Sequence, residues 1–265
     1  GLRRAHKLDA HTHGIASAWK CDRQQAGTSP RMISTARLAF SKKSPVEGTS
    51  KRFGCVLHAW AMRASMAAND SGERCKGVNC MWGDPSGFLG GAALTAMAMA
   101  GGGQNKAALD LLAPRLGDSV IELGCGPGMG VRAALKRVGR EGFVAGIDQS
   151  ATAAHFAAHA VHGACLEGRA AIMRAEAVDL PFRDSMFDRA FAVNSFQFWV
   201  DPARALREIS RVLAPGGRLV ITQRAAGHDS GTNFAGAARG MDRIGQATAL
   251  LKAQGWRIVD ERCVQ

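Results

Sequence analysis

A glycine-rich run between an apolar segment and a helical segment places the strongest constraint on the fold of this chain. Residues 119–123 are mostly apolar, residues 124–130 contain four glycines, and residues 131–138 have the apolar spacing of a helix. Glycine is needed where the backbone turns sharply or approaches a ligand closely, because it has no Cβ. A strand, a loop of this kind and a helix, in this order, are typical of sheets that bind a nucleotide-like ligand.

Strands and helices alternate along the rest of the chain. Further strands are predicted at residues 143–147, 171–174, 189–193, 218–222 and 257–264, and helices at residues 104–113, 152–162, 203–213 and 243–254. Short apolar strands that alternate with helices favour a parallel sheet covered on both faces. We therefore expect a doubly wound, mostly parallel, Rossmann-like α/β sheet with helices on both faces.

Acidic residues stand at the ends of three successive predicted strands. Glu122 lies two residues before Gly124, Asp148 lies 20 residues after Gly128, and Glu176 follows the third strand. A carboxylate at the end of the second strand can accept both hydroxyl groups of a ribose, and an acid after the third can accept the exocyclic amine of adenine. The three acids predict a nucleoside at the carboxyl edge of the sheet.

The order and spacing of these motifs resemble the class I S-adenosylmethionine-dependent methyltransferases. The resemblance is strongest to the small-molecule branch that includes the ubiquinone and menaquinone biosynthesis enzymes. It spans residues 82–264, and Glu176 stands where the family usually has Asp. The segments that match the family's motifs are residues 82–87, 120–128, 146–150, 175–182, 187–188 and 205–217.

This resemblance implies that the chain binds S-adenosylmethionine and transfers its methyl group to a small-molecule acceptor by in-line displacement. The implied cofactor contacts are Glu122 at the methionine amino group, Gly124, Cys125, Gly126 and Gly128 along the methionine and ribose, Asp148 at the ribose hydroxyls, Gln149 beside the adenine, Glu176 and Ala177 at the adenine edge, and Asn194 near the transferred methyl.

The sequence does not assign a catalytic residue. The cofactor is already activated, so the protein mainly supplies orientation and desolvation, and a general base is needed only if the acceptor must lose a proton. His155, His159 and His162 share one predicted helix, and we expect them outside the site. The pair His228–Asp229, which follows the fifth strand, is the better candidate for a base.

Two other classes of protein remain open. One is a non-catalytic protein that binds S-adenosylmethionine, and the other is a nicotinamide-dependent Rossmann oxidoreductase. Glu122 before the glycine loop and the segments 180–182 and 215–217 argue against the oxidoreductase. The acceptor itself and the oligomeric state cannot be read from the sequence.

The C-terminal end departs from the family pattern. Members usually end in an antiparallel strand that pairs beside the sixth strand, but no residues follow Gln265 to form it. We therefore expect the sheet to lack a complete final antiparallel strand and to leave an unpaired edge. Residues 92–103 are expected to form a lid helix with a glycine hinge over the acceptor side.

The first 80 residues differ in composition from the rest. They carry 14 Lys and Arg against 5 Asp and Glu, and they account for +9 of the net charge of +12. Their apolar periodicity is weak, so we expect residues 1–80 to be a disordered basic leader or a non-native extension, and residues 81–265 to be the domain. The leader resembles a transit peptide in composition, which gives an organelle as the alternative to a cytoplasmic location.

Composition argues against several classes of function. The charge of +3 on residues 81–265 gives no reason to expect a nucleic-acid partner. No stretch reaches the roughly 18 apolar residues of an integral membrane segment, and the seven cysteines lack the even count and regular spacing of a disulfide framework. No metal site is expected, because His11, His13, Cys75 and Cys80 have no partner ligands at suitable spacing.

Overall fold

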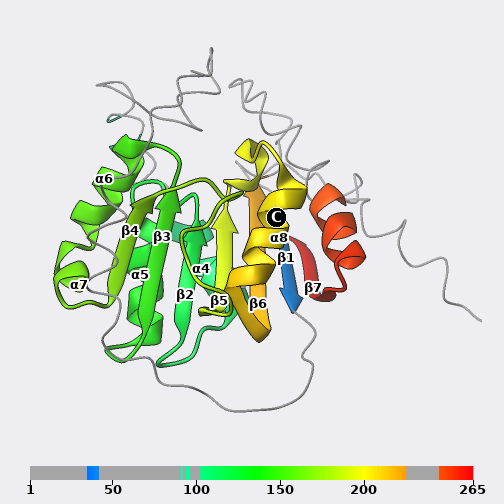
Figure 1. Ribbon diagram of the computed structural model, residues 1–265, viewed down its shortest axis with the longest axis horizontal. Helices are drawn as coiled ribbons and strands as arrows, with labels where there is room; N and C mark the ends of the chain where they lie inside the picture. The colour runs from blue at the N-terminus through cyan, green and yellow to red at the C-terminus, as the bar shows by residue number, and fades with distance from the viewer. Residues whose placement is uncertain (1–34, 42–90, 92–93, 96–101, 225–244, 265) are drawn as a thin grey trace, which may run out of the picture. The chain divides into compact units, whose positions relative to one another are not determined.

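The computed structural model describes residues 35–41, 91, 94–95, 102–224 and 245–264 (Figure 1). Contacts divide the chain into two units, Gly1–Met32 and Ile33–Gln265, and all described residues belong to the second. The possible leader outside residues 35–41, most of the expected lid helix and the pair His228–Asp229 lie outside the described residues.

A seven-stranded sheet forms the centre of this unit, in the order β4-β3-β2-β5-β6-β1-β7 (Figure 1). The five strands from β4 to β6 pair in parallel, as expected. Chain order reverses between β2 and β5, and this is the switch point where parallel sheets bind ligands. The strands are β1 (Thr35–Ser41), β2 (Ser119–Leu123), β3 (Phe143–Asp148), β4 (Ala170–Arg174), β5 (Phe187–Val193), β6 (Leu213–Arg224) and β7 (Arg257–Val264).

Helices cover both faces of the sheet, which confirms the doubly wound architecture. One apolar cluster joins the sheet to α8 and the helix at residues 245–253, and a second joins it to α4, α5 and α6. The helices are α4 (Gly102–Leu112), α5 (Met129–Val138), α6 (Ala151–Ala160), α7 (His162–Leu166), the short 3-10 helix η1 (Phe196–Phe198) and α8 (Pro202–Val212).

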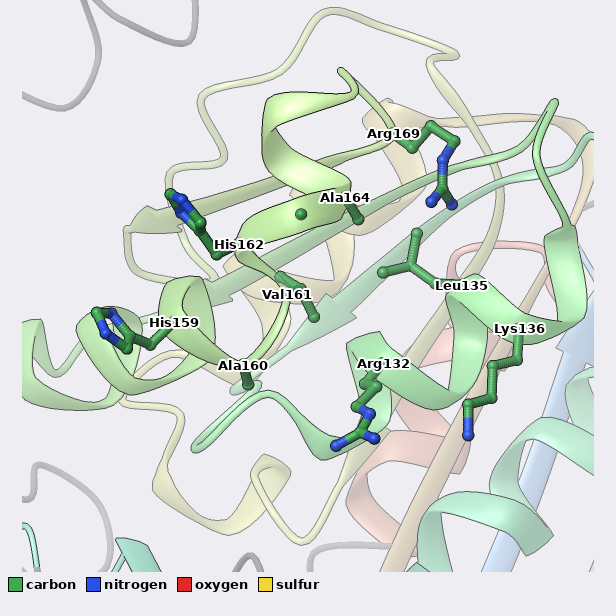
Figure 2. A pocket seen from close by; sticks show the side chains of 10 residues that line it. Arg132, Leu135, Lys136, His159, Ala160, Val161, His162, Ala164 and Arg169 are labelled. Atoms are coloured by element: carbon green, nitrogen blue, oxygen red, sulfur yellow. The ribbon is translucent and has the colours of Figure 1, made fainter.

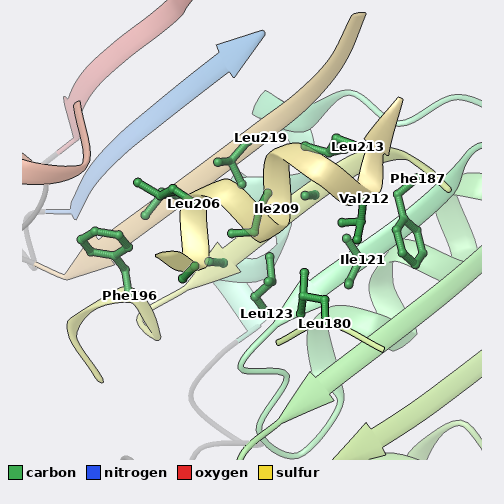
Figure 3. Close-up of a cluster of buried hydrophobic side chains, with 14 of the residues drawn as sticks. Ile121, Leu123, Leu180, Phe187, Phe196, Leu206, Ile209, Val212, Leu213 and Leu219 are labelled. Atoms are coloured by element: carbon green, nitrogen blue, oxygen red, sulfur yellow. The ribbon is translucent and has the colours of Figure 1, made fainter. Parts of the chain in front are cut away.

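The sequence of α8 explains where that helix begins and which face it buries. Asp201 caps its first turn by accepting a hydrogen bond from the Arg204 backbone N–H at 2.9 Å. Leu206, Ile209 and Val212 recur at helical spacing and are fully buried against the sheet (Figure 3). The helix therefore fixes the chain between the ends of β5 and β6.

The segment Thr35–Ser41 lies inside the sheet, between β6 and β7. It pairs antiparallel with both neighbours, from Thr35 opposite Arg224 and Val264 to Ser41 opposite Arg218 and Arg257. The expectation that the antiparallel strand is missing is therefore wrong, and these seven residues are not part of a leader outside the domain. The physical reason is that β6 and β7 offer unpaired backbone N–H and C=O groups, which any extended segment can satisfy.

Two expected boundaries also differ in the structure. The expected turn at residues 215–217 is a bulge inside β6, where the register with β5 jumps from Leu213 to Arg218. The helix expected at residues 152–162 is interrupted at Val161, whose φ of −124° separates α6 from α7.

Candidate active site

The glycine loop between β2 and α5 has a backbone that only glycine adopts readily. Gly124, Gly126 and Gly128 have φ values of 74°, 50° and 83°, in the left-handed region. A Cβ on Gly124 would overlap the Ser195 side chain, and a Cβ on Gly128 would lie 2.8 Å from Ala157 Cα. Neighbouring elements therefore pack against the loop so closely that side chains are excluded.

Asp148, the last residue of β3, ties this loop to the neighbouring strand. Its side chain is 7% exposed. One carboxylate oxygen accepts the Gly126 backbone N–H at 2.8 Å, and the other accepts the Ser150 backbone N–H at 2.9 Å. The predicted ribose-binding acid thus lies directly beside the predicted methionine-binding loop.

Glu122 lies on the other side of the loop, in β2, with only 2% of its surface exposed. Burial raises the pKa of its carboxyl group well above the ordinary value, the Val131 backbone N–H opposes that shift, and the charge of Asp148 adds to it. The Oε2 atom is buried and has no hydrogen-bond partner among the described residues. A buried acceptor in this state is expected to meet a donor supplied by a ligand.

Cys125 presents no side chain to the carboxyl edge of the sheet. It is 3% exposed and packs in the cluster that contains α4, α5 and α6. Its backbone N–H donates to the Ile147 carbonyl at 2.9 Å, and burial raises the pKa of its thiol well above the ordinary value. Its predicted cofactor contact is consequently limited to backbone atoms.

Asn194 lies just beyond the end of β5, with a left-handed φ of 53°. Its backbone N–H donates to the Thr222 carbonyl at 2.8 Å, and its side-chain Nδ2 donates to Gln104 Oε1. The Gln197 Nε2 atom donates to the Asn194 carbonyl at 3.3 Å. These contacts bring α4, β5 and β6 together at the edge where the methyl acceptor is expected.

Sequence reasoning missed Gln104, Ser195 and Gln197 at this edge. Ser195 Oγ donates to the Leu123 carbonyl at 2.5 Å and thereby fixes the end of β2 against the segment after β5. The polar residues that directly follow the apolar strand β5 were a usable signal for Ser195 and Gln197. Gln104 had no such signal, because it lies 90 residues from Asn194.

The expected adenine contacts follow β3 and β4, which are neighbouring parallel strands. Gln149 is half-buried, and its carbonyl accepts a hydrogen bond from Arg174 Nε at 3.1 Å. Glu176 is exposed, and Ala177 packs on the apolar cluster below α8. Pairing of Asp148 with Arg174 brings these residues to the same edge as the glycine loop.

The three helical histidines lie on the surface, on α6 and α7. His155, His159 and His162 are exposed, and the rings of His155 and His159 are 5.5 Å apart. Among the residues that the structure describes, no group of three or more His, Cys, Asp or Glu is arranged to hold a metal ion. Within the same part of the chain, no helix is long and apolar enough to cross a membrane.

A comparison with known protein families finds a domain that is similar to this part of the chain. Residues 121–221, which run from β2 into β6, match the family model described as a methyltransferase domain. Over these residues the chain is similar to methyltransferase domains. The match includes the glycine loop and both buried acids, Glu122 and Asp148.

Curated relatives that match part of this chain include methyltransferases. Methyltransferase GfsG of Streptomyces halstedii is 32% identical over 53% of this chain and 48% of its own length. O-methyltransferase cnsE of Penicillium expansum is 34% identical over 44% of this chain and 42% of its own length. The chain thus spans less than half the length of either relative.

The fold of the described residues also occurs in a solved structure. A SAM dependent methyltransferase from Aquifex aeolicus superimposes with a TM-score of 0.54 at 20% identity, over 62% of this chain and 87% of that protein. At this level of identity the likeness supports the fold alone.

Proposed function

We propose that this domain transfers a methyl group from S-adenosylmethionine to a small-molecule acceptor. The observation that carries the proposal is the pair of buried acids, Glu122 and Asp148, on either side of a glycine loop at the switch point of the sheet. The methyltransferase family match and the O-methyltransferase among the relatives support the reaction class.

The residues at this edge fit S-adenosylmethionine. The unpaired Oε2 of Glu122 is suited to a cationic donor such as the amino group of the methionine moiety. Glycine at 124 and 128 lets the loop turn sharply and pack against Ser195 and Ala157, which holds the loop backbone at this edge of the sheet. Asp148 is suited to the ribose hydroxyls, and Gln149, Glu176 and Ala177 to the adenine.

Bound S-adenosylmethionine would supply an activated methyl group on a positively charged sulfur. The chain's own contribution is then to bind, orient and exclude water. The glycine loop, tied to β3 through Asp148, holds its shape before a ligand arrives, which lowers the entropy cost of binding. Asn194, held by Gln104 and Gln197, lies where it can orient the acceptor.

A methyl-transfer assay tests this proposal. The full chain is incubated with S-adenosylmethionine labelled in its methyl group and with a panel of quinols, phenols, amines and lipids. We expect label in at least one acceptor, formation of S-adenosylhomocysteine, and loss of both in Asp148→Asn. Tight cofactor binding without product across the panel would instead favour a non-catalytic binding protein.

Domain extent and location are proposals that rest mainly on composition. We propose that residues 81–265 together with Thr35–Ser41 form the methyltransferase domain, and that the remaining residues of 1–80 form a basic leader. The balanced charge of residues 81–265 supports a small-molecule acceptor over a nucleic acid. We propose a cytoplasmic location, with an organelle as the alternative, and cell fractionation with an antibody to the chain distinguishes them.

A further inference from the structure

Basic residues line an open hollow between α5 and the junction of α6 with α7, and Figure 2 shows the rings of His159 and His162 directed away from Leu135. The hollow has a volume of about 350 Å³, and none of the ten residues that line it is Asp or Glu. It lies along α5, where the Arg132 backbone N–H donates to the Gly128 carbonyl of the glycine loop at 3.0 Å, and none of its residues is a predicted cofactor contact. Its five basic residues are Arg132, Lys136, His159, His162 and Arg169.

Most of the positive charge at this hollow has no acidic partner: in the described part of the chain, Arg169 alone among its basic residues forms an ion pair, with Glu167, which directly follows α7. Arg132 and Lys136 are four residues apart on α5, a spacing that places like charges side by side on the helix surface. The helices α5, α6 and α7 contain no acidic residue. Neither Arg132 nor Lys136 forms an ion pair with a residue that the structure describes, whereas the adjacent Arg137 pairs with Asp110.

Apolar side chains form the floor between the charged groups. Leu135 and Val161 are 9% and 5% exposed. Figure 2 shows Arg132 and Arg169 on opposite sides of Leu135, Val161 and Ala164. A ligand seated here would meet cations at two sides and hydrocarbon beneath.

We propose that this hollow binds a phosphate-bearing small molecule. The phosphate or pyrophosphate group lies between Arg132, Lys136 and Arg169, and the carbon skeleton lies on the apolar floor. A guanidinium group is a planar fork of donors that suits phosphate oxygens, and Arg169 can exchange its exposed partner Glu167 for the ligand. None of the lining residues is Phe or Trp, so the hollow lacks the large stacking surfaces of a nucleic-acid groove.

Gly163 offers a matched pair of variants at the wall of the hollow. A Cβ at this helical residue would meet no atom within 4 Å, so a short side chain fits without strain. Gly163→Asp places a negative charge in the hollow, and Gly163→Asn places a neutral side chain of the same shape there. Calorimetric titration of the full chain with inorganic pyrophosphate compares the two. We expect affinity to fall about tenfold or more in Gly163→Asp and about twofold or less in Gly163→Asn.

A second pair of variants separates the hollow from net charge. Arg132→Gln with Lys136→Gln and Arg207→Gln with Lys252→Gln each remove two positive charges, but only the first pair touches the hollow. We expect only the first pair to weaken pyrophosphate binding, by about tenfold.

Three results would overturn the proposal. The first is that matched variants behave alike: Gly163→Asp binds pyrophosphate as tightly as Gly163→Asn, or the two double variants lose the same affinity for pyrophosphate. The second is displacement of pyrophosphate by S-adenosylhomocysteine, which would place the anion at the glycine loop. The third is double-stranded DNA that binds through the same residues more tightly than pyrophosphate. None of these results depends on methyl transfer, so the proposed function is tested separately.

Discussion

Two halves of the sheet are assembled in different ways. The cofactor half, β4-β3-β2-β5, comes from one continuous stretch between Ser119 and Val193, and each strand connects to the next through nearby helices or turns. The distal half, β6-β1-β7, combines three segments that are far apart in the sequence, and one of them, Thr35–Ser41, comes from the N-terminal part of the chain. The proposed chemistry depends on local geometry, whereas completion of the sheet depends on long-range pairing.

The two halves also differ in how much change they tolerate. In the cofactor half, the glycines of the loop contact other elements so closely that a Cβ does not fit. In the distal half, Gly216 has a left-handed φ of 76° but nothing within 4 Å of a Cβ. A Cβ therefore fits at Gly216 but not in the glycine loop, although a Cβ at the neighbouring Gly217 would also lie 2.8 Å from the Ala214 carbonyl oxygen.

Among the variants that test this comparison, removal of β1 should have the largest effect on stability. A chain that lacks residues 1–41 loses both backbone ladders of β1, whereas a chain that lacks residues 1–34 keeps them. We expect the longer deletion to lower the free energy of unfolding by more than about 4 kcal/mol relative to the shorter one, measured by urea denaturation. Equal unfolding midpoints for the two deletions would refute the role of β1.

Alanine at matched glycines tests the difference in close packing. Gly128→Ala adds a clash with Ala157 to the strain of a left-handed residue, whereas Gly216→Ala adds strain alone. We expect thermal unfolding to report losses of about 3 kcal/mol and about 1 kcal/mol, respectively. Similar losses would mean that the glycine loop is no more constrained than the bulge of β6.

Glu122→Gln separates the function of the cofactor half from its stability. In the folded wild-type protein, the raised pKa keeps Glu122 protonated at pH values above its ordinary pKa of 4.5. The free energy of unfolding therefore falls as the pH rises from 4.5 toward the raised pKa. The variant should not show this fall above pH 4.5 in urea denaturation. It should also bind S-adenosylmethionine about tenfold more weakly, because an amide cannot lose a proton to become a charged acceptor for the amino group of the ligand. A parallel pH dependence in both proteins would contradict the assignment of a raised pKa.

Helix caps should give the smallest effects: one cap begins α6, which follows β3 of the cofactor half, and the other begins α8, which joins the two halves. The Ser150 hydroxyl accepts the Ala153 backbone N–H at 3.2 Å at the start of α6, and Asp201 caps α8. Ser150→Ala and Asp201→Ala should each lower the free energy of unfolding by about 1 kcal/mol. A much larger loss in one of them would show that its helix has a role beyond local capping.

Patterns among residues that are close together in the sequence predicted most strands and site residues of the cofactor half. The bounds of β2 were found from its apolar residues and the following glycines, and Asp148 and Glu122 from their places at strand ends. The same kind of signal found β7. These features depend on neighbouring residues, which is why periodicity and spacing detect them.

Features that depend on distant partners were missed. Nothing in Thr35–Ser41 indicates that it pairs with residues near 220 and 260, so its strand was counted as leader. The contact of Gln104 with Asn194 and the basic hollow between α5 and α7 were missed for the same reason. Such contacts follow from the topology, and only the assembled fold shows them.

Calorimetric titration with S-adenosylhomocysteine and with NAD tests the central claim most directly. The wild-type chain should bind S-adenosylhomocysteine and not NAD, and Asp148→Asn should weaken that binding by about tenfold or more. Asp184→Asn, which alters an exposed carboxylate that is paired with Arg211, should leave the affinity unchanged. Binding of NAD in place of S-adenosylhomocysteine, or equal affinity for S-adenosylhomocysteine in all three proteins, would contradict the account.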